Sequence, residues 1–230
     1  MKIKNLSLMT AFLLISVCGK SQVDRTINVA SADATVTDRE IKELYIPPAE
    51  RGGGRPFMEL LNERKSTRKF SEREIRPHVL STLLWAANGI NREEDGKRTA
   101  PSARDMREID IYVITQQGAY LYVPEVHQVK LIKTGDFRKE AAGRSDFAAN
   151  APVILVFVSN AKKMAKMDVA SRDLYAHLDC GYVSQNVYLY CASEHLATVA
   201  IGGVDKIGMS KVLGLKEDKV ILSQPIGYID

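Results

Sequence analysis

The stretch Cys180-Gly-Tyr-Val-Ser-Gln-Asn-Val-Tyr-Leu-Tyr-Cys-Ala-Ser193 contains no charged residue. As a helix it is apolar on most of its circumference, and such a helix belongs in a protein interior or an interface. It is too short to cross a membrane, and it carries the polar residues Ser184, Gln185 and Asn186. The sequence therefore predicts a long central helix within residues 171–203.

Two glycines follow this helix. Thr198-Val-Ala-Ile201 is typical of a short buried strand, and Gly202-Gly203 ends it. Because glycine has no Cβ, the backbone at such a pair can approach a ligand closely. A plain turn would use the same two residues, so both interpretations stay open.

The other expected elements combine helices with a hairpin. The continuous apolar run 152–158 predicts a central strand that is buried on both faces. We expect helices that start at Pro56 and at Pro77, and further helices that are capped by Asp136 and Asp205 and reach Ala142 and Leu213. Strands are expected at 109–114 and 220–228, and a hairpin is expected between 119–123 and 128–132. A charged loop over 91–98 is expected to cover an opening. Trp85 is expected to pack against other side chains. This order favours an α+β sheet domain over a regular βαβ array.

The first 21 residues have the pattern of a signal peptide. Lys2 and Lys4 precede an apolar run, and small residues stand at positions 19 and 21. The sequence therefore predicts export, into the periplasm. A lipid anchor through Cys18 is the second interpretation, and a retained anchor is the third. Residues 22–55, punctuated by Pro47-Pro48 and Gly52-Gly53-Gly54, are expected to form a linker or arm, and 56–230 a single domain.

Composition excludes several classes of function. The formal net charge is +4, and the three lysines of the leader account for most of it, so the mature chain does not have the charge of a nucleic-acid-binding protein. Cys180 and Cys191 lie about 16 Å apart along the predicted helix, which is too far for a disulfide. The histidines His78, His127, His177 and His195 show no metal-ligand spacing. We therefore expect no metal site and no disulfide.

A basic cluster follows the first predicted helix. Arg64, Lys65, Ser66 and Arg68 lie within five residues. Cations beside a short hydroxyl suit a phosphate group, and Arg68 could hold another part of the same ligand. A solvated helix end would have the same composition, because cations are favoured at helix C-termini.

Together these segments resemble the FMN-dependent nitroreductase family, from about Phe57 to the end of the chain. Four stretches carry the resemblance in the family's order: Arg64-Lys-Ser-Thr-Arg-Lys-Phe70, Ala100-Pro-Ser-Ala103, the helix Gly181–Leu189, and Val199-Ala-Ile-Gly-Gly203, followed by the closing Pro225-Ile-Gly-Tyr228. The resemblance implies a mixed sheet flanked by helices, with a long core helix at the centre of a homodimer.

The resemblance also implies a cofactor site. Arg64, Lys65 and Ser66 would contact the phosphate and ribityl chain of FMN, and Arg68 would lie at the flavin N1 and O2 edge. The backbone of Ala200, Ile201, Gly202 and Gly203 would face flavin N5 and O4. Asp105 stands where much of the family has an asparagine facing the flavin pyrimidine. An ionised Asp105 would oppose reduced flavin unless it is protonated or paired with Arg104 or Arg107. The basic residues that follow the family's last strand have no counterpart before Asp230, so FMN affinity is expected to be lower.

The implied activity is that of an oxidoreductase. Hydride would pass through flavin N5 in a two-step ping-pong reaction between a small-molecule donor and acceptor, with no catalytic acid or base from the protein. An exported protein meets little NAD(P)H, so the donor stays open. Two alternatives remain. One is a flavin-binding homodimer without turnover, and the other is a dehydrogenase of modified peptides, because the wording around Ala87, Lys97 and Glu108 is similar to the azoline-oxidising (SagB-type) branch.

Overall fold

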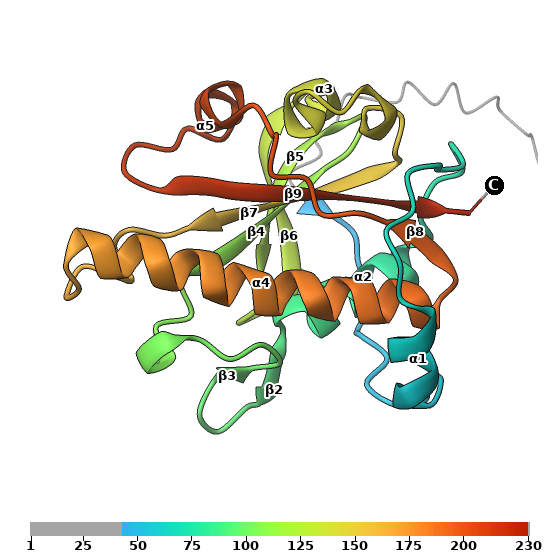
Figure 1. Ribbon diagram of the computed structural model, residues 1–230, viewed down its shortest axis with the longest axis horizontal. Helices are drawn as coiled ribbons and strands as arrows, with labels where there is room; N and C mark the ends of the chain where they lie inside the picture. The colour runs from blue at the N-terminus through green and yellow to red at the C-terminus, as the bar shows by residue number, and fades with distance from the viewer. Residues whose placement is uncertain (1–42, 230) are drawn as a thin grey trace, which may run out of the picture. The chain divides into compact units, whose positions relative to one another are not determined.

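The computed structural model describes residues 43–229 (Figure 1). The predicted signal peptide, Cys18 and residues 22–42 of the predicted arm lie outside this range. The described chain forms a seven-stranded sheet in the order β1-β6-β5-β4-β7-β9-β8, and each neighbouring pair is antiparallel. The strands are β1 (Glu43–Leu44), β4 (Ile109–Ile114), β5 (Gly118–Val123), β6 (Gln128–Thr134), β7 (Val153–Ser159), β8 (Leu196–Thr198) and β9 (Lys219–Tyr228).

Strand β7 is buried along its whole length, as its apolar sequence predicts. Side chains alternate across a strand, so Val153, Leu155 and Phe157 join one hydrophobic core and the residues between them join another. Helices α2 (Pro77–Asn88) and α4 (Val169–Ser193) cover the first face, and α3 (Arg138–Ala142) and α5 (Lys206–Leu213) contribute to the second (Figure 1). The α+β fold with a long core helix is confirmed.

Helix α4 is 25 residues long and begins well before the uncharged stretch. Its N-cap, Asp168, accepts a hydrogen bond from the Ser171 backbone N–H (2.9 Å). Val183 and Val187 are buried on the side that faces the sheet. On the opposite side Leu174, Leu178 and Tyr182 are about half exposed. Their spacing of four residues places them in one row, so α4 carries an apolar surface that residues 43–229 leave exposed.

Several element boundaries differ from the sequence-based expectations. The expected loop over 91–98 is largely a small hairpin of β2 (Ile90–Arg92) and β3 (Lys97–Arg98). The strand expected at 198–201 is β8, which ends at Thr198, and Ile201 then forms one isolated bridge to Ser223. Helix α3 begins at Arg138 with Phe137 as its N-cap, although Asp136 does accept from the Arg138 N–H (3.1 Å). The shorter elements are α1 (Phe57–Glu63), η1 (Ala103–Asp105) and η2 (Asp146–Ala148).

The described part of the predicted arm packs against the domain. Strand β1 pairs with β6, which makes it an edge strand of the sheet. The Ser81 hydroxyl donates to the Pro47 carbonyl (2.5 Å) and contacts His127 Nε2 (2.7 Å), whose Nδ1 lies 2.9 Å from the Tyr122 hydroxyl. These partly buried contacts fix the arm to α2 and to the β5–β6 hairpin. Within residues 43–229, no helix is long and apolar enough to cross a membrane.

Candidate functional site

Tyr188 of α4 joins two of the segments that the sequence predicts for a cofactor site. Its hydroxyl lies 3.0 Å from Ser66 Oγ and accepts a hydrogen bond from the Ala200 backbone N–H (2.8 Å). The Arg64 guanidinium lies over its ring, 5.1 Å from the centroid. The Thr67 N–H also donates to the Thr198 carbonyl (2.9 Å). The structure therefore brings Arg64, Ser66 and Ala200 together, although these residues come from distant parts of the sequence.

The basic loop is open to a ligand. Lys65, Ser66 and Arg68 are exposed, and Arg64 is half-buried. A pocket of about 370 Å³ lies beside them, and its lining includes Lys65, Tyr188, His195 and Thr198. An exposed hydroxyl beside cations suits an anionic group, as the sequence indicates.

Neither the backbone angles nor the packing of the described residues requires glycine at positions 202 and 203. Neither residue has a positive φ angle. A Cβ at Gly202 would meet nothing within 4 Å, and a Cβ at Gly203 would meet only the Arg144 side chain, at 3.7 Å. The Ala200 N–H bonds to Tyr188 and the Ile201 N–H to the Ser223 carbonyl, whereas the N–H groups of the two glycines donate to no other described residue. Of the four predicted backbone contacts, these two are the donors that remain for a ligand.

Gly143 anchors this turn to the end of α3. The Arg144 N–H donates to the Gly203 carbonyl (3.3 Å), and the Asp205 N–H donates to the Glu140 carbonyl (3.2 Å). Gly143 has a φ of +58°, and a Cβ there would collide with the Gly203 carbonyl and lie 2.8 Å from the Asp205 nitrogen. The close backbone approach therefore sets the position of the glycine turn. A pocket of about 790 Å³ borders it, lined in part by Arg144, Gly203 and Lys206.

Asp105 lies elsewhere. Its turn contains three left-handed residues, Arg104, Asp105 and Arg107, with φ between 50° and 55°. Arg107 binds both Asp105 carboxylate oxygens (2.8 and 2.5 Å), and this ion pair lowers the pKa of Asp105. The turn is held to α4 by a bond from the Ala103 N–H to Asp179 (2.7 Å), nine residues before Tyr188. That spacing is about 14 Å along a helix, so α4 does not bring Asp105 to the loop of Arg64 and Ser66 within one chain.

A buried carboxyl pair supports the Asp105 turn. Glu108 is fully buried, neither of its oxygens has a hydrogen-bond partner among residues 43–229, and Asp179 is also buried. Burial first, then the neighbouring Asp179, raises the pKa of Glu108 to about 7. Two neighbouring buried carboxylates repel each other, so a proton on Glu108 removes the unfavourable charge beside Asp179. Neither residue was predicted as part of a site, because nothing in the local sequence indicates that both are buried.

The two cysteines and Trp85, which the sequence also draws attention to, lie in surroundings that indicate a role in folding and not in binding. Cys180 and Cys191 are buried free thiols, as expected, and residues 43–229 contain no cluster of His, Cys, Asp and Glu that could hold a metal ion. Trp85 does more than pack, because its Nε1 donates to the Ile90 carbonyl (2.9 Å) and helps to close the turn after α2.

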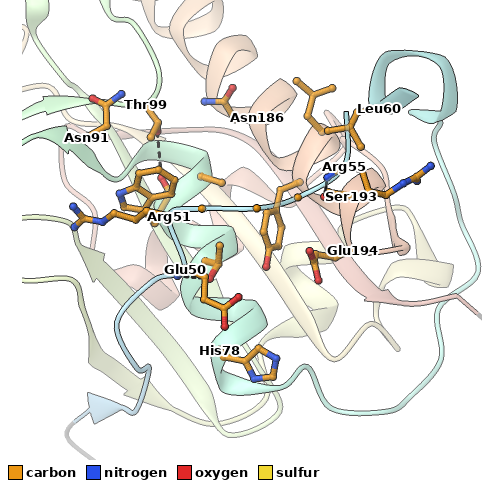
Figure 2. Close-up of a pocket in the computed structure, with 18 residues that line it drawn as sticks. Glu50, Arg51, Arg55, Leu60, His78, Asn91, Thr99, Asn186, Ser193 and Glu194 are labelled. Atoms are coloured by element: carbon orange, nitrogen blue, oxygen red, sulfur yellow. Dashed lines mark hydrogen bonds between the residues drawn. The ribbon is translucent and has the colours of Figure 1, made fainter. Parts of the chain in front are cut away.

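A further pocket of about 490 Å³ lies where residues 50–55 cross between α2 and α4 (Figure 2). Arg51 there pairs with Glu93 (2.7 Å), and Arg55 pairs with Glu63 (2.5 Å). None of the nine predicted cofactor residues lines this pocket. It is therefore separate from the candidate site around Tyr188.

Comparison with known proteins places these features in a family. Residues 61–228 match the Nitroreductase family. A proposed nitroreductase of Methanocaldococcus jannaschii is 31% identical over 178 residues, which cover 74% of this chain and 89% of that protein. The crystal structure of a proposed nitroreductase of Ralstonia eutropha has 39% identity and a TM-score of 0.77, with 80% of this chain and 88% of that chain covered. The NADPH:FMN oxidoreductase of Vibrio harveyi, solved with NAD+, has a TM-score of 0.57 at 22% identity and covers 76% of this chain and 69% of its own.

We predict that Gly143→Ala destabilises the protein by about 2–4 kcal/mol, because it combines a left-handed φ with a backbone collision. Gly214→Ala is the matched control, since Gly214 has a φ of +67° and a Cβ there would meet no atom within 4 Å. Urea unfolding measures both variants. Equal losses would show that backbone strain alone matters and that contact with the glycine turn does not.

We predict that Glu108→Gln changes how stability depends on pH. The folded pKa of about 7 lies above the ordinary value of 4.5, so folding takes up a proton between these pH values. The contribution of that proton to the free energy of unfolding is complete below about pH 4.5 and is lost as the pH rises through 7. The variant should therefore be more stable than wild type by about 1–3 kcal/mol at pH 8, with the difference shrinking toward pH 5. Chemical unfolding at several pH values tests this, with the exposed Glu217→Gln as control; a difference that does not vary with pH would contradict it.

Proposed function

Because this chain belongs to the nitroreductase family, we propose that it is an FMN-dependent oxidoreductase acting by a two-step ping-pong mechanism. It would take a hydride from a small-molecule donor and deliver it to a small-molecule acceptor. The observation that carries the proposal is the open backbone of Gly202 and Gly203 on the loop that Tyr188 ties to Ser66. The fold needs no glycine at Gly202, so the space is available to a flat ligand.

The residues present fit FMN. The exposed Ser66 hydroxyl and the cations of Arg64 and Lys65 would hold the phosphate end, and the N–H groups of Gly202 and Gly203 would bond to the ring. FMN, when bound, supplies the hydride chemistry, and no protein acid or base is proposed. Arg68 is exposed and forms no ion pair within residues 43–229, so its charge would be free to stabilise negative charge on the ring.

We also propose that the protein acts as a homodimer. The exposed row of Leu174, Leu178 and Tyr182 on α4 is an apolar surface that a second copy would cover. The turn of Asp105 is attached to α4 at Asp179, about 14 Å along the helix from Tyr188, so Asp105 would serve the site of a partner subunit and not that of its own chain. Its pairing with Arg107 offsets the charge that would otherwise oppose reduced flavin.

We propose that the protein is exported to the periplasm. Export to the periplasm rests on the signal-like residues 1–21, and the alternative of a lipid anchor rests on Cys18. The electron donor follows from that setting, because NAD(P)H would serve an internal enzyme better than an exported one. Two alternatives are a flavin-binding dimer without turnover and a dehydrogenase of modified peptides. Measuring whether the bound flavin is reduced, and by which donor, distinguishes them from the proposed oxidoreductase.

The test of the proposal is the visible spectrum of the purified protein. We expect flavin bands at about one equivalent per subunit, bleached under anaerobic conditions by a reductant that the protein accepts. Bound flavin that NADH and NADPH leave oxidised would point to another donor. A protein that stays colourless with excess FMN would overturn the cofactor assignment.

A variant of the glycine turn tests the geometry directly. Gly202→Ala should leave the folding stability within about 0.5 kcal/mol of wild type, because the added Cβ meets open space. It should weaken FMN binding by about ten-fold or more, since the methyl group fills the place of the ring. Titration of the apoprotein with FMN measures this, and Gly52→Ala, also open but distant in the arm, is the control. Unchanged FMN affinity would remove the turn from the site.

A further inference from the structure

The Tyr188 hydroxyl can accept one hydrogen bond and donate another. The Ala200 N–H can only donate, so the phenol oxygen accepts at 2.8 Å. The phenol hydrogen is then available to Ser66 Oγ, 3.0 Å away, and either of these two hydroxyls can be the donor. An anion beside Ser66 selects one of the two arrangements, because the Ser66 hydrogen then donates to the anion and Ser66 Oγ accepts from Tyr188. The resulting order is N–H of Ala200, hydroxyl of Tyr188, hydroxyl of Ser66, anion.

This order leaves the Ser66 hydroxyl hydrogen free. Ser66 accepts from Tyr188 and is exposed, so its own O–H can donate outward. Hydrogen bonds in a chain polarise one another, which makes the last donor stronger. The Arg64 guanidinium over the Tyr188 ring adds a positive charge at the same place. The outward group is thus a donor beside a cation, and its natural partner is an anion.

Tyr188 is also well placed to hold this geometry. It lies on α4 between Val187 and Cys191, which are both buried in the core on the sheet side of the helix. The backbone of Ala200 is fixed in turn, because the next residue, Ile201, bridges to Ser223. A rigid helix and a rigid loop therefore define where the Ser66 hydroxyl sits.

We propose that Tyr188 is a positioning residue that makes the site select a phosphorylated flavin over an unphosphorylated one. It does so by accepting from the Ala200 N–H and donating to Ser66, which directs the Ser66 hydroxyl hydrogen toward the phosphate. The proposal rests on the flavin site proposed above, and it adds a residue and a basis for ligand selectivity.

Titration of the purified apoprotein with FMN and with riboflavin tests the proposal. Tyr188→Phe keeps the ring and removes the hydroxyl. We expect it to lower FMN affinity about five- to ten-fold and to change riboflavin affinity less than about two-fold, because only the phosphate contact is lost. Tyr175→Phe, on the same helix, is the matched control and should bind both flavins as the wild type does.

A double-mutant cycle gives a readout that a merely structural role would not produce. Ser66→Ala should cause a similar loss for FMN, and Tyr188→Phe should add little in the Ser66→Ala background, because the two hydroxyls act as one chain. Ser66 is exposed, so its variant reports on selectivity even if Tyr188→Phe folds poorly.

The outcomes separate the two proposals. Wild-type protein that binds neither flavin overturns the proposed function. Wild-type protein that prefers FMN, with a Tyr188→Phe variant of unchanged preference, overturns only the role of Tyr188. Equal losses for FMN and riboflavin in that variant also overturn it, since they would show that Tyr188 merely supports the loop.

Discussion

Burial of β7 on both faces is the constraint on which the rest of the structure depends. A strand with no polar side chain before Ser159 must be covered on both sides, and its alternation divides the interior into two cores. One core needs α2 and α4, and the other needs α3 and α5. The chain passes between these layers at the end of the sheet, where β8 leads into the Gly202-Gly203 turn and on to α5 (Figure 1).

Helix α4 transmits that constraint to the candidate site. Its sheet-facing side fixes its position, and its flanks then present Asp179 to the Asp105 turn and Tyr188 to the basic loop. Because the two residues are nine apart, the two turns contact positions about 14 Å apart along the helix, one near its middle and one near its C-terminal end. This separation and the row of Leu174, Leu178 and Tyr182, which the described residues leave exposed, have a common explanation in the proposed homodimer.

Charges around the two turns are arranged to suit a ligand that gains negative charge. The Asp105 carboxylate is neutralised by Arg107, and burial disfavours the charged form of Glu108. The exposed cations Lys65 and Arg68 remain on the other turn. At these two turns the charge of Asp105 and Glu108 is therefore offset while Lys65 and Arg68 stay exposed, which would favour the anionic cofactor proposed above.

The sequence by itself determined the parts that local pattern controls. Apolar runs predicted β7 and β9, proline and Asn88-Gly89 bounded α2, and Asp205 capped α5, because each of these depends on nearby residues alone. Motif order also identified the family. The sequence missed the 90–98 hairpin, the early end of β8 and the packing of the arm, since these depend on which strand or helix lies alongside.

Only the tertiary structure decided how the predicted site residues relate to one another. It joined Arg64, Ser66 and Ala200 through Tyr188, it separated Asp105 from them, and it revealed the buried Glu108 beside Asp179. The physical reason is that hydrogen bonds and desolvation act over a few ångströms between residues more than a hundred positions apart, as Ser66 and Tyr188 are. Pattern along the chain indicates which residue types are present, and packing determines which of them meet.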